Sequence, residues 1–366
     1  MNLQAYMEQG VSGISEKVTR YYLKNAAGIR FLANFVPALN KSAKARAAYE
    51  KNGQHIPQFL ICSITSRCNL HCRGCYARAG SICSDAAAND QMTADEWRSV
   101  FSQAEKLGIS FILLAGGEPL MRRDVLETAA CFPSIAFPVF TNGTMLDDAY
   151  LSLFDAHRNL IPVLSIEGDG VATNARRGAG VAEKIDAVIK MLQAKRILYA
   201  ASVTVTNENL REVATKDYLS VLRARDCGII FYVEYVPVEK ETEYLTLSES
   251  EADWLNQRVC DLRDAQNDMC IFSFPGDEQF TEGCLAAGRG FFHINPNGGA
   301  EPCPFSPHSS LNVRESNLTD VLNSTFFDEV RRIEQADTIH DSGCTLFRHA
   351  DEVRALLQAN QESSTL

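Results

Sequence analysis

The chain has 366 residues, of which 46% are hydrophobic and 22% charged, a composition typical of a globular protein with one large domain and a smaller one. Acidic residues outnumber basic ones by 46 to 35, and the net charge of −11 argues against nucleic acid as a partner. No apolar run is long enough to cross a membrane, and the N-terminus lacks the basic-then-apolar order of a signal peptide. We therefore expect a cytoplasmic protein.

Residues 1–55 form an N-terminal extension with a helical pattern, which is interrupted near Pro37 and is rich in lysine and arginine. Two interpretations of these helices remain open. They cover the open side or the bottom of the barrel that follows, or their basic face makes a peripheral contact with an anionic membrane or an acidic partner.

Six short apolar runs, rich in β-branched residues, follow at residues 58–65, 110–117, 136–143, 161–168, 199–206 and 229–237. Helical segments lie between them; residues 93–108, for example, begin with a threonine cap and end at a glycine. Strands and helices that alternate in this way predict parallel βαβ units. We predict an α/β fold, a partial (β/α)6 TIM-like barrel over residues 56–240, after which the alternation ends.

Polar or glycine-rich motifs follow four of the predicted strands. Three cysteines follow the first strand, "GGEP" (116–119) follows the second, "TNG" (141–143) ends the third and "SIEG" (165–168) ends the fourth. Function in such folds gathers where the strands end and the loops leave the sheet. These motifs therefore predict one site.

The three cysteines Cys68, Cys72 and Cys75 lie within eight residues and indicate a metal centre. A structural zinc site is closed by four ligands, and His71 is the nearby candidate for the fourth. A 4Fe-4S cluster is commonly held by four thiolates, so three would leave one iron open to a small ligand. The spacing favours the cluster.

The order Cys68-x3-Cys72-x2-Cys75-Tyr76, "GGEP", "TNG" and "SIEG" resembles the radical S-adenosylmethionine (SAM) superfamily over residues 56–240. The resemblance implies that the three cysteines hold a 4Fe-4S cluster whose open iron binds SAM. It also implies reductive cleavage of SAM to a 5'-deoxyadenosyl radical that abstracts hydrogen, with reduced flavodoxin or ferredoxin as electron donor. The SAM-binding residues that it implies are Tyr76, Gly116, Gly117, Glu118, Ser165, Glu167, Arg177 (or the adjacent Arg176) and Asn207.

The region 241–350 contains three more widely spaced cysteines, Cys284, Cys303 and Cys344. A β-hairpin is predicted over residues 290–304, and a helix over 318–335. This order resembles the Twitch domain, the shorter relative of the SPASM domain, and implies an auxiliary 4Fe-4S cluster held by the three cysteines.

The auxiliary site lacks an evident fourth ligand. Asp341, its neighbour His340, another cysteine (Cys260 or Cys270) and the substrate itself are the open alternatives. The last segment, residues 351–366, is a tail whose polar end from residue 358 is expected to be disordered.

The substrate side has three candidate catalytic residues, Cys83 as a hydrogen-atom donor and Glu234 and Tyr235 at the end of the sixth strand. We expect an enzyme acting on a small molecule, a cofactor precursor or a lipid, with the auxiliary cluster binding substrate or accepting an electron. The alternatives are an enzyme that crosslinks, oxidises or epimerises a peptide and, in another class, a non-enzymatic iron-sulfur electron carrier or scaffold.

Overall fold

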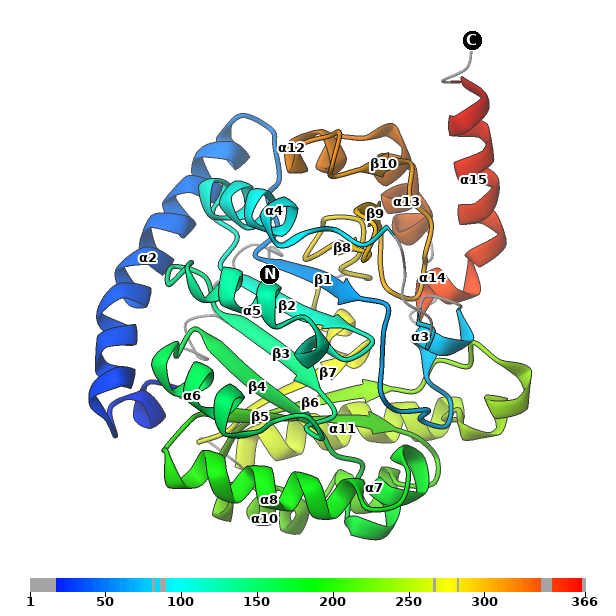
Figure 1. Cartoon of the computed structure of the whole chain (residues 1–366). Coiled ribbons are helices and arrows are strands. Elements are labelled where there is room, and N and C mark those ends of the chain that lie inside the picture. The colour runs from blue at the N-terminus through cyan, green and yellow to red at the C-terminus, as the bar shows by residue number, and fades with distance from the viewer. Residues whose placement is uncertain are drawn as a thin grey trace.

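Seven parallel strands, arranged in their order along the chain, form the centre of the fold (Figure 1). A computed structural model describes residues 18–80, 83–85, 90–265, 268–281, 283–336 and 344–363. The strands are β1 (Phe59–Thr65), β2 (Phe111–Gly116), β3 (Phe137–Thr141), β4 (Leu160–Ser165), β5 (Tyr199–Val205), β6 (Cys227–Glu234) and β7 (Cys270–Phe274). The first six confirm the predicted strands and the α/β fold class.

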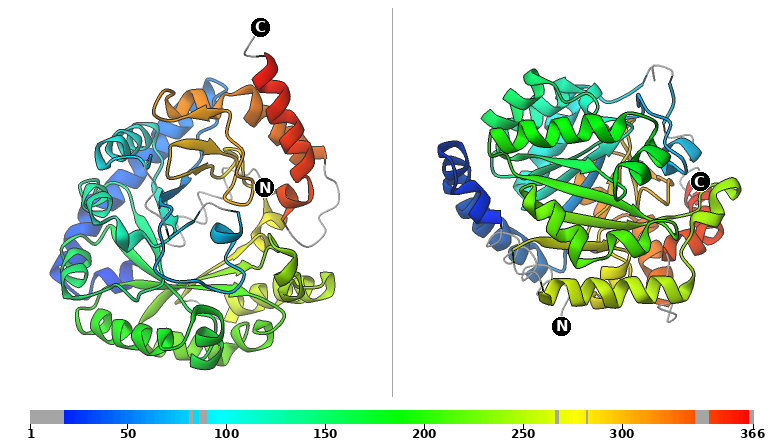
Figure 2. Two further views of the ribbon diagram at one scale, coloured as in Figure 1. Left: turned by 45° about the vertical axis from the view of Figure 1, so that its right-hand side comes forward. Right: turned by 90° about the horizontal axis from the view of Figure 1, so that it is seen from below.

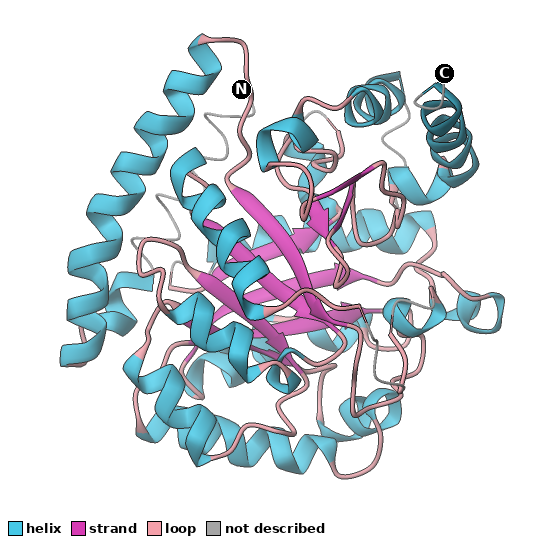
Figure 3. Cartoon of the chain, turned by 45° about the horizontal axis from the view of Figure 1, so that its top comes forward, coloured by secondary structure: helices cyan, strands magenta, loops and turns pink. Residues whose placement is uncertain are grey.

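Helices cover the outer face of the curved sheet, so that cyan helices surround the magenta strands in Figure 3. The packed helices are α4 (Ala94–Leu107), α5 (Arg123–Ala130), α6 (Asp148–Ala156), α8 (Val181–Ala194), α10 (Lys216–Ala224) and α11 (Glu249–Ala265). Helix α4 starts where Thr93 and Glu96 form a reciprocal capping box, and it ends at Gly108, whose φ of 87° suits glycine. Its buried face, which includes the fully buried Trp97, packs into the main core.

Shorter elements shape the loops at the ends of the strands. They are α3 (Tyr76–Ala79), η1 (Pro119–Met121), α7 (Gly170–Arg177), α9 (Leu210–Val213), η2 (Lys240–Leu245) and η3 (Gly276–Phe280). The arrowheads in Figure 1 point toward α3, which places this helix at the carboxyl ends of the strands.

The seventh strand corrects the expectation that the alternation of strands and helices ends at residue 240. Helix α11 follows β6, and β7 then pairs in parallel with β6, with Ile229 opposite Cys270 and Val233 opposite Phe274. The segment was missed because periodicity alone does not assign a short apolar run to a strand, although the turn dipeptide Pro275-Gly276 follows it.

Helix α2 (Ala26–Lys51) covers the amino ends of the strands, on the side of the sheet away from α3 (Figures 1 and 2). Phe31 and Phe35 lie on its buried face and belong to a second apolar cluster. In this cluster the Phe35 ring packs edge-on against the Phe111 ring of β2, with ring centroids 6.0 Å apart. The covering role predicted for the N-terminal helices is therefore observed for α2.

The C-terminal region continues the same sheet beyond β1. Strands β8 (His293–Ile294), β9 (Gly299–Glu301) and β10 (Leu311–Asn312) follow one another antiparallel, as the predicted hairpin requires, and β8 lies parallel to β1. A buried chain of polar contacts joins them: the Ser63 hydroxyl lies 2.8 Å from His293 Nε2, and His293 Nδ1 lies 2.7 Å from Glu301. The hairpin is thereby held in register against β1.

Four helices end the described chain: α12 (Leu318–Leu322), α13 (Thr325–Ala336), α14 (Thr345–Arg348) and α15 (Ala350–Ser363). Two of them replace the single helix expected over 318–335. Helix α15 contradicts the disordered tail expected from residue 358, since alanine, glutamine and glutamate favour helix despite their polarity. Across the described ranges, no helix combines the length and the apolar character that a membrane span needs.

Candidate functional site

A cavity of about 1000 Å³ runs through the interior of the curved sheet, from the carboxyl ends of the strands to helix α2. Its α2 side is apolar and aromatic, with Phe31, Phe111 and Phe231 among the lining residues. Its other side is lined by the two predicted groups of cysteines, Cys68, Cys72, Cys75, Cys284, Cys303 and Cys344. Two cysteine triads that lie far apart in the sequence therefore share one cavity.

The first triad lies on a loop that leaves β1 and ends at Cys75, the residue that precedes α3. The Arg78 guanidinium stabilises the loop by donating hydrogen bonds to the carbonyls of Leu70 at 2.9 Å and Cys68 at 3.2 Å. The Arg73 amide donates to the Arg176 carbonyl at 2.9 Å. The chain thus fixes the loop through its backbone and leaves the cysteine side chains facing the cavity.

Gly116 and Gly117 bring the end of β2 against the segment that leads into this loop. The amides of Gly117 and Glu118 donate to the carbonyls of Thr65 and Arg67, each at 2.8 Å. A Cβ on Gly116 would lie 2.3 Å from the Thr65 oxygen, and one on Gly117 would lie 2.1 Å from the Arg67 oxygen. Only glycine permits this approach, so both glycines position the cysteine loop as well as lining the cavity.

The Glu118 carboxylate is buried, with 1% of the residue exposed, and lines the cavity. It accepts hydrogen bonds from the Thr141 hydroxyl at 2.7 Å and from the amides of Leu120 at 3.0 Å and Asn142 at 2.8 Å. Burial raises the pKa of Glu118 above its ordinary value, although these three donors oppose the rise. The "GGEP" and "TNG" motifs are therefore joined through one carboxylate.

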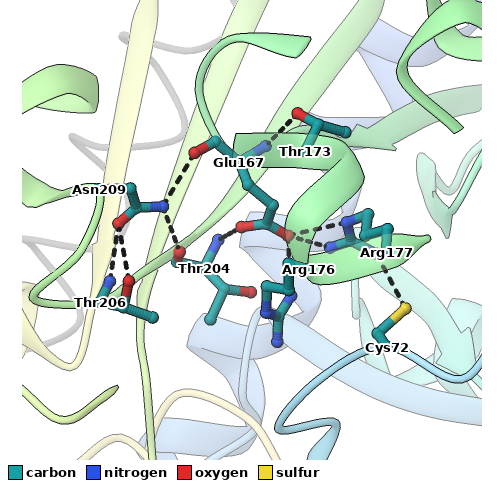
Figure 4. Close-up of polar contacts among 8 residues, drawn as sticks. All are labelled: Cys72, Glu167, Thr173, Arg176, Arg177, Thr204, Thr206 and Asn209. Atoms are coloured by element: carbon teal, nitrogen blue, oxygen red, sulfur yellow. Dashed lines mark hydrogen bonds and ion pairs between the residues drawn. The ribbon is translucent and has the colours of Figure 1, made fainter. Parts of the chain in front are cut away.

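Glu167, beyond the end of β4, is the centre of the network drawn in Figure 4. Its carboxylate forms ion pairs with Arg176, at 2.8 Å, and with Arg177, and it accepts from the Thr204 amide at 3.0 Å. Burial acts to raise the pKa of Glu167, but the two guanidinium groups outweigh burial and hold the pKa below its ordinary value. Arg177 also lies 3.9 Å from the Cys72 sulfur.

The network places Arg176 and Arg177 on the cavity wall and Glu167 behind them, outside the lining. Burial raises the pKa of the Cys72 thiol, while the charges of Arg177 and Arg176 oppose the rise. Two cations beside this sulfur favour its thiolate, the form that binds metal. Ser165, in the same region, also lines the cavity.

Asn209 is a site-supporting residue that the sequence analysis missed. Its amide donates to the carbonyls of Glu167 at 3.0 Å and Thr204 at 2.9 Å, tying the ends of β4 and β5 together (Figure 4). The predicted Asn207 is exposed instead, outside the described lining, and donates to the Tyr244 carbonyl at 2.6 Å. The run "TNEN" contains both asparagines, and sequence alone could not decide which of them faces inward.

Cys83 lies behind the first triad and not on the described cavity wall. A hydrogen bond joins the thiol of Cys83 to that of Cys68, and it raises the pKa of Cys68 and lowers the pKa of Cys83. Cys83 is buried, with 5% of the residue exposed. This position does not support the predicted role of Cys83 as a hydrogen-atom donor to a substrate in the cavity.

The second triad is assembled from three separate segments. Cys284 follows η3, Cys303 follows β9 and Cys344 precedes α14. The Ala287 amide donates to the Pro302 carbonyl at 3.1 Å, which joins the segments of the first two cysteines. Of the alternative ligands, Cys270 lines the cavity and Cys260 does not, whereas Asp341 and His340 lie outside the described residues.

Two aromatic residues connect the walls of the cavity. Tyr76, next to Cys75, packs against Phe305, two residues beyond Cys303, with ring centroids 5.0 Å apart. The Tyr235 ring packs so closely on Gly74, which has a φ of 65°, that a Cβ there would lie 2.7 Å from the ring. Tyr235 and Glu234 both line the cavity, as predicted for the substrate side.

The cysteines suit clusters better than single ions. Nowhere in the described chain do three histidine, cysteine, aspartate or glutamate side chains converge as one metal ion would require. His71, the alternative zinc ligand, is exposed and lies 3.0 Å from Asp85. A 4Fe-4S cluster is commonly held by several thiolates, and the three cysteines of each triad line the same cavity.

Comparison with known proteins adds a family and several relatives. Residues 62–219 match the family model described as the radical SAM superfamily. The PqqA peptide cyclase of Rhizobium meliloti is 26% identical over 72% of this chain and 73% of that protein. The AdoMet-dependent heme synthase of Methanosarcina barkeri is also 26% identical, over 76% of this chain and 86% of that protein.

Solved structures share the fold at lower identity. Streptococcus suis SuiB bound to its precursor peptide SuiA superposes with a TM-score of 0.63 and 16% identity, covering 79% of this chain and 70% of SuiB. The protein anSMEcpe with bound AdoMet superposes with a TM-score of 0.59 and 14% identity, covering 84% of this chain and 100% of that chain. Both likenesses extend beyond the barrel strands.

Proposed function

Because this chain belongs to the radical SAM superfamily and is a SAM-dependent iron-sulfur enzyme, we propose that its cavity holds a substrate between two 4Fe-4S clusters. The observation that carries the proposal is that both cysteine triads line one cavity of about 1000 Å³. When bound, the clusters and SAM supply one-electron transfer and abstraction of a hydrogen atom. The family excludes the non-enzymatic carrier considered above.

Cys68, Cys72 and Cys75 hold the cluster that binds SAM in this proposal, and Cys284, Cys303 and Cys344 hold the auxiliary cluster. Arg176 and Arg177 supply positive charge beside Cys72, where a carboxylate of SAM would be stabilised. Tyr76, Gly116, Gly117, Glu118 and Ser165 form the remaining SAM-facing wall. Glu167 acts through the two arginines, and Asn207 is not included.

We propose a small molecule or cofactor precursor with an apolar part as the substrate. A cavity of this volume is at the upper end of small-molecule sites, which leaves room for SAM and a compact substrate. The aromatic half beneath the cysteines, with Phe231 and Phe111, suits apolar groups, including those of a lipid. The alignment with the AdoMet-dependent heme synthase covers 86% of that protein.

A peptide is the second candidate substrate. The relative from Rhizobium meliloti is named a PqqA peptide cyclase, and SuiB was solved with its precursor peptide SuiA. For this chain, a peptide would have to place one side chain or loop in the cavity.

One experiment tests the proposal and separates the two substrate classes. The enzyme is reconstituted with iron and sulfide without oxygen, reduced with dithionite, and assayed for 5'-deoxyadenosine formed from SAM. Cell extract from the source organism is then added as small-molecule and large-molecule fractions, each with and without protease treatment. Stimulation by the small-molecule fraction that survives protease supports our proposal, stimulation that protease removes supports a peptide, and no 5'-deoxyadenosine at all refutes both.

Three partner and location predictions remain predictions. Reduced flavodoxin or ferredoxin is our proposed electron donor, and the cytoplasm is the proposed location. The proposed peripheral membrane contact would be made by the outer face of α2, where Lys41 and Lys44 are exposed. Phe31 and Phe35, on the opposite face, are buried against the sheet.

A further inference from the structure

Glu234 is a buried carboxylate that has no partner in the described part of the protein. It is the last residue of β6, only 6% of it is exposed, and it lines the cavity that both cysteine triads share. No hydrogen bond or ion pair to its carboxylate occurs among the described residues. A buried carboxylate without a partner is costly, so its presence at the substrate side calls for a ligand.

A second carboxylate, that of Glu278, lies beside Glu234. The parallel pairing of Val233 with Phe274 sets the end of β6 next to the turn that starts η3, and η3 contains Glu278. Burial, and after it the charge of Glu278, raises the pKa of Glu234 to about 8. The Glu278 carboxylate is itself buried and accepts hydrogen bonds from Cys284 and from the Leu285 amide.

The cationic side chains on the described cavity wall are already occupied. Arg176 and Arg177 both pair with Glu167, and Arg263 pairs with Asp277 at 2.7 Å. Thiolates of two clusters would make the cavity more negative still. Among the described residues no cation acts on Glu234, whereas Arg289 and Arg348, which lie outside the cavity lining, act on Glu278.

We infer that Glu234, supported by Glu278, forms a subsite for a positively charged group of the substrate, an ammonium or a guanidinium. The inference rests on the proposed function, because it places that group in the cavity between the two cysteine triads. A metal ion is a poorer occupant, since no three ligating side chains converge in the described chain. A cation fits because its charge and its N–H donors both match two carboxylates in a wall with few other polar groups.

The subsite also defines what the cavity rejects. A carboxylate or phosphate placed at Glu234 would face two acidic groups across an apolar wall that includes Phe231 and Phe272. We therefore assign the proposed substrate an apolar body with a cationic end near β6 and β7, and its anionic groups, if it has any, to the Arg176 side.

A charge-matched ligand series tests the subsite without knowledge of the substrate. The probes are 2-phenylethylammonium, its neutral analogue 2-phenylethanol and the anion 3-phenylpropanoate, titrated calorimetrically into the anaerobically reconstituted enzyme. We expect the ammonium to bind at least about tenfold more tightly than the alcohol, since a hydrogen bond to a charged group adds about 1.5–3 kcal/mol. Equal binding of the ammonium and the alcohol would overturn the inference even if no variant were made.

The variant Glu234→Gln keeps the shape of the side chain and removes its ability to ionise, and no hydrogen bond joins Glu234 to a described cysteine. We expect this variant to lose the preference for the ammonium, with its iron content and thermal unfolding midpoint at acidic pH close to those of the wild type. The matched control is Glu241→Gln, an exposed glutamate in η2 seven residues away that does not line the cavity.

The two proposals fail in distinguishable ways. An unchanged ammonium preference in Glu234→Gln refutes the subsite while SAM cleavage by the wild type upholds the proposed function. Absence of SAM cleavage in the wild type refutes the proposed function whatever the probes bind.

Discussion

The two cysteine triads face the same cavity but are built in different ways. The first occupies one loop between β1 and α3, held by backbone contacts from Arg78 and from the glycines at the end of β2. The second collects Cys284, Cys303 and Cys344 from three segments. A local loop determines the first geometry, whereas the second depends on the docking of the hairpin against β1. The spacing of the first triad therefore predicts that its members lie together, whereas only the fold brings the members of the second triad to one place.

The predicted consequences differ in the same way. Loss of the first triad should remove the initiating chemistry, whereas loss of the second should remove only a later step. Four predictions follow this contrast from its largest effect to its smallest.

Cys72→Ala should abolish SAM cleavage. Cys72 lies beside Arg177 on the cavity wall, and loss of one of three thiolates leaves the cluster without enough ligands. The measurement is 5'-deoxyadenosine formed under dithionite, together with the iron content. Cys131→Ala, which removes an exposed thiol outside the cavity lining, is the control and should behave as wild type. Wild-type SAM cleavage by Cys72→Ala would remove this cysteine from the site.

Cys284→Ala should lower the iron content by about four atoms per chain and leave uncoupled SAM cleavage intact. This outcome would separate the two triads chemically. Cys260→Ala serves as the control, because Cys260 is half-exposed on α11 and does not line the cavity. If iron is unchanged in Cys284→Ala, the auxiliary cluster is not held as proposed.

Glu167→Gln should destabilise the protein by about 3 kcal/mol, because it leaves two buried guanidinium groups without their carboxylate. SAM should also bind more weakly, since Arg176 and Arg177 lose their orientation. Thermal unfolding and SAM titration measure the two effects. The control Glu127→Gln breaks an exposed ion pair with Arg123 and should cost less than about 0.5 kcal/mol. Equal effects of the two substitutions would show that the Glu167 network is not structural.

The last prediction concerns how the free energy of unfolding depends on pH through Glu234, on the substrate side of the cavity. The pKa of Glu234 rises from its ordinary value of 4.5 to about 8 on folding, by burial first and then by the charge of Glu278. The folded protein therefore holds a proton there that the unfolded chain releases, so this group's contribution to stability is lost as the pH rises from about 4.5 to about 8.

Glu234→Gln should flatten this part of the stability profile, because glutamine does not titrate. Unfolding midpoints of the wild type, Glu234→Gln and the control Glu241→Gln, measured across this pH range, provide the comparison. A decline of equal slope in all three proteins would place the titration elsewhere.

Several features of the site were predictable because they depend on local chemistry. The first triad, the paired glycines and the strand-end position of Glu118 were predicted from spacing, and the cavity includes all of them. Asn207 and Glu167 lie outside the described cavity lining, because both residues follow a strand end, where the loop and not the alternation of the strand sets the direction of a side chain. Strand β7 was missed because a short apolar run cannot be assigned to a strand by periodicity alone.

The sequence by itself determined the parallel α/β fold, the radical SAM motifs and the identity of the six cysteines. These features follow from hydrophobic period, turn residues and ligand spacing, which act within a few residues. Only the tertiary structure decided that both triads face one cavity and that Glu167 forms ion pairs with two arginines. It also decided that Glu234 has no hydrogen-bond or ion-pair partner among the described residues. The physical reason is that pairing and burial are relations between segments far apart in the chain, and a linear pattern does not record them.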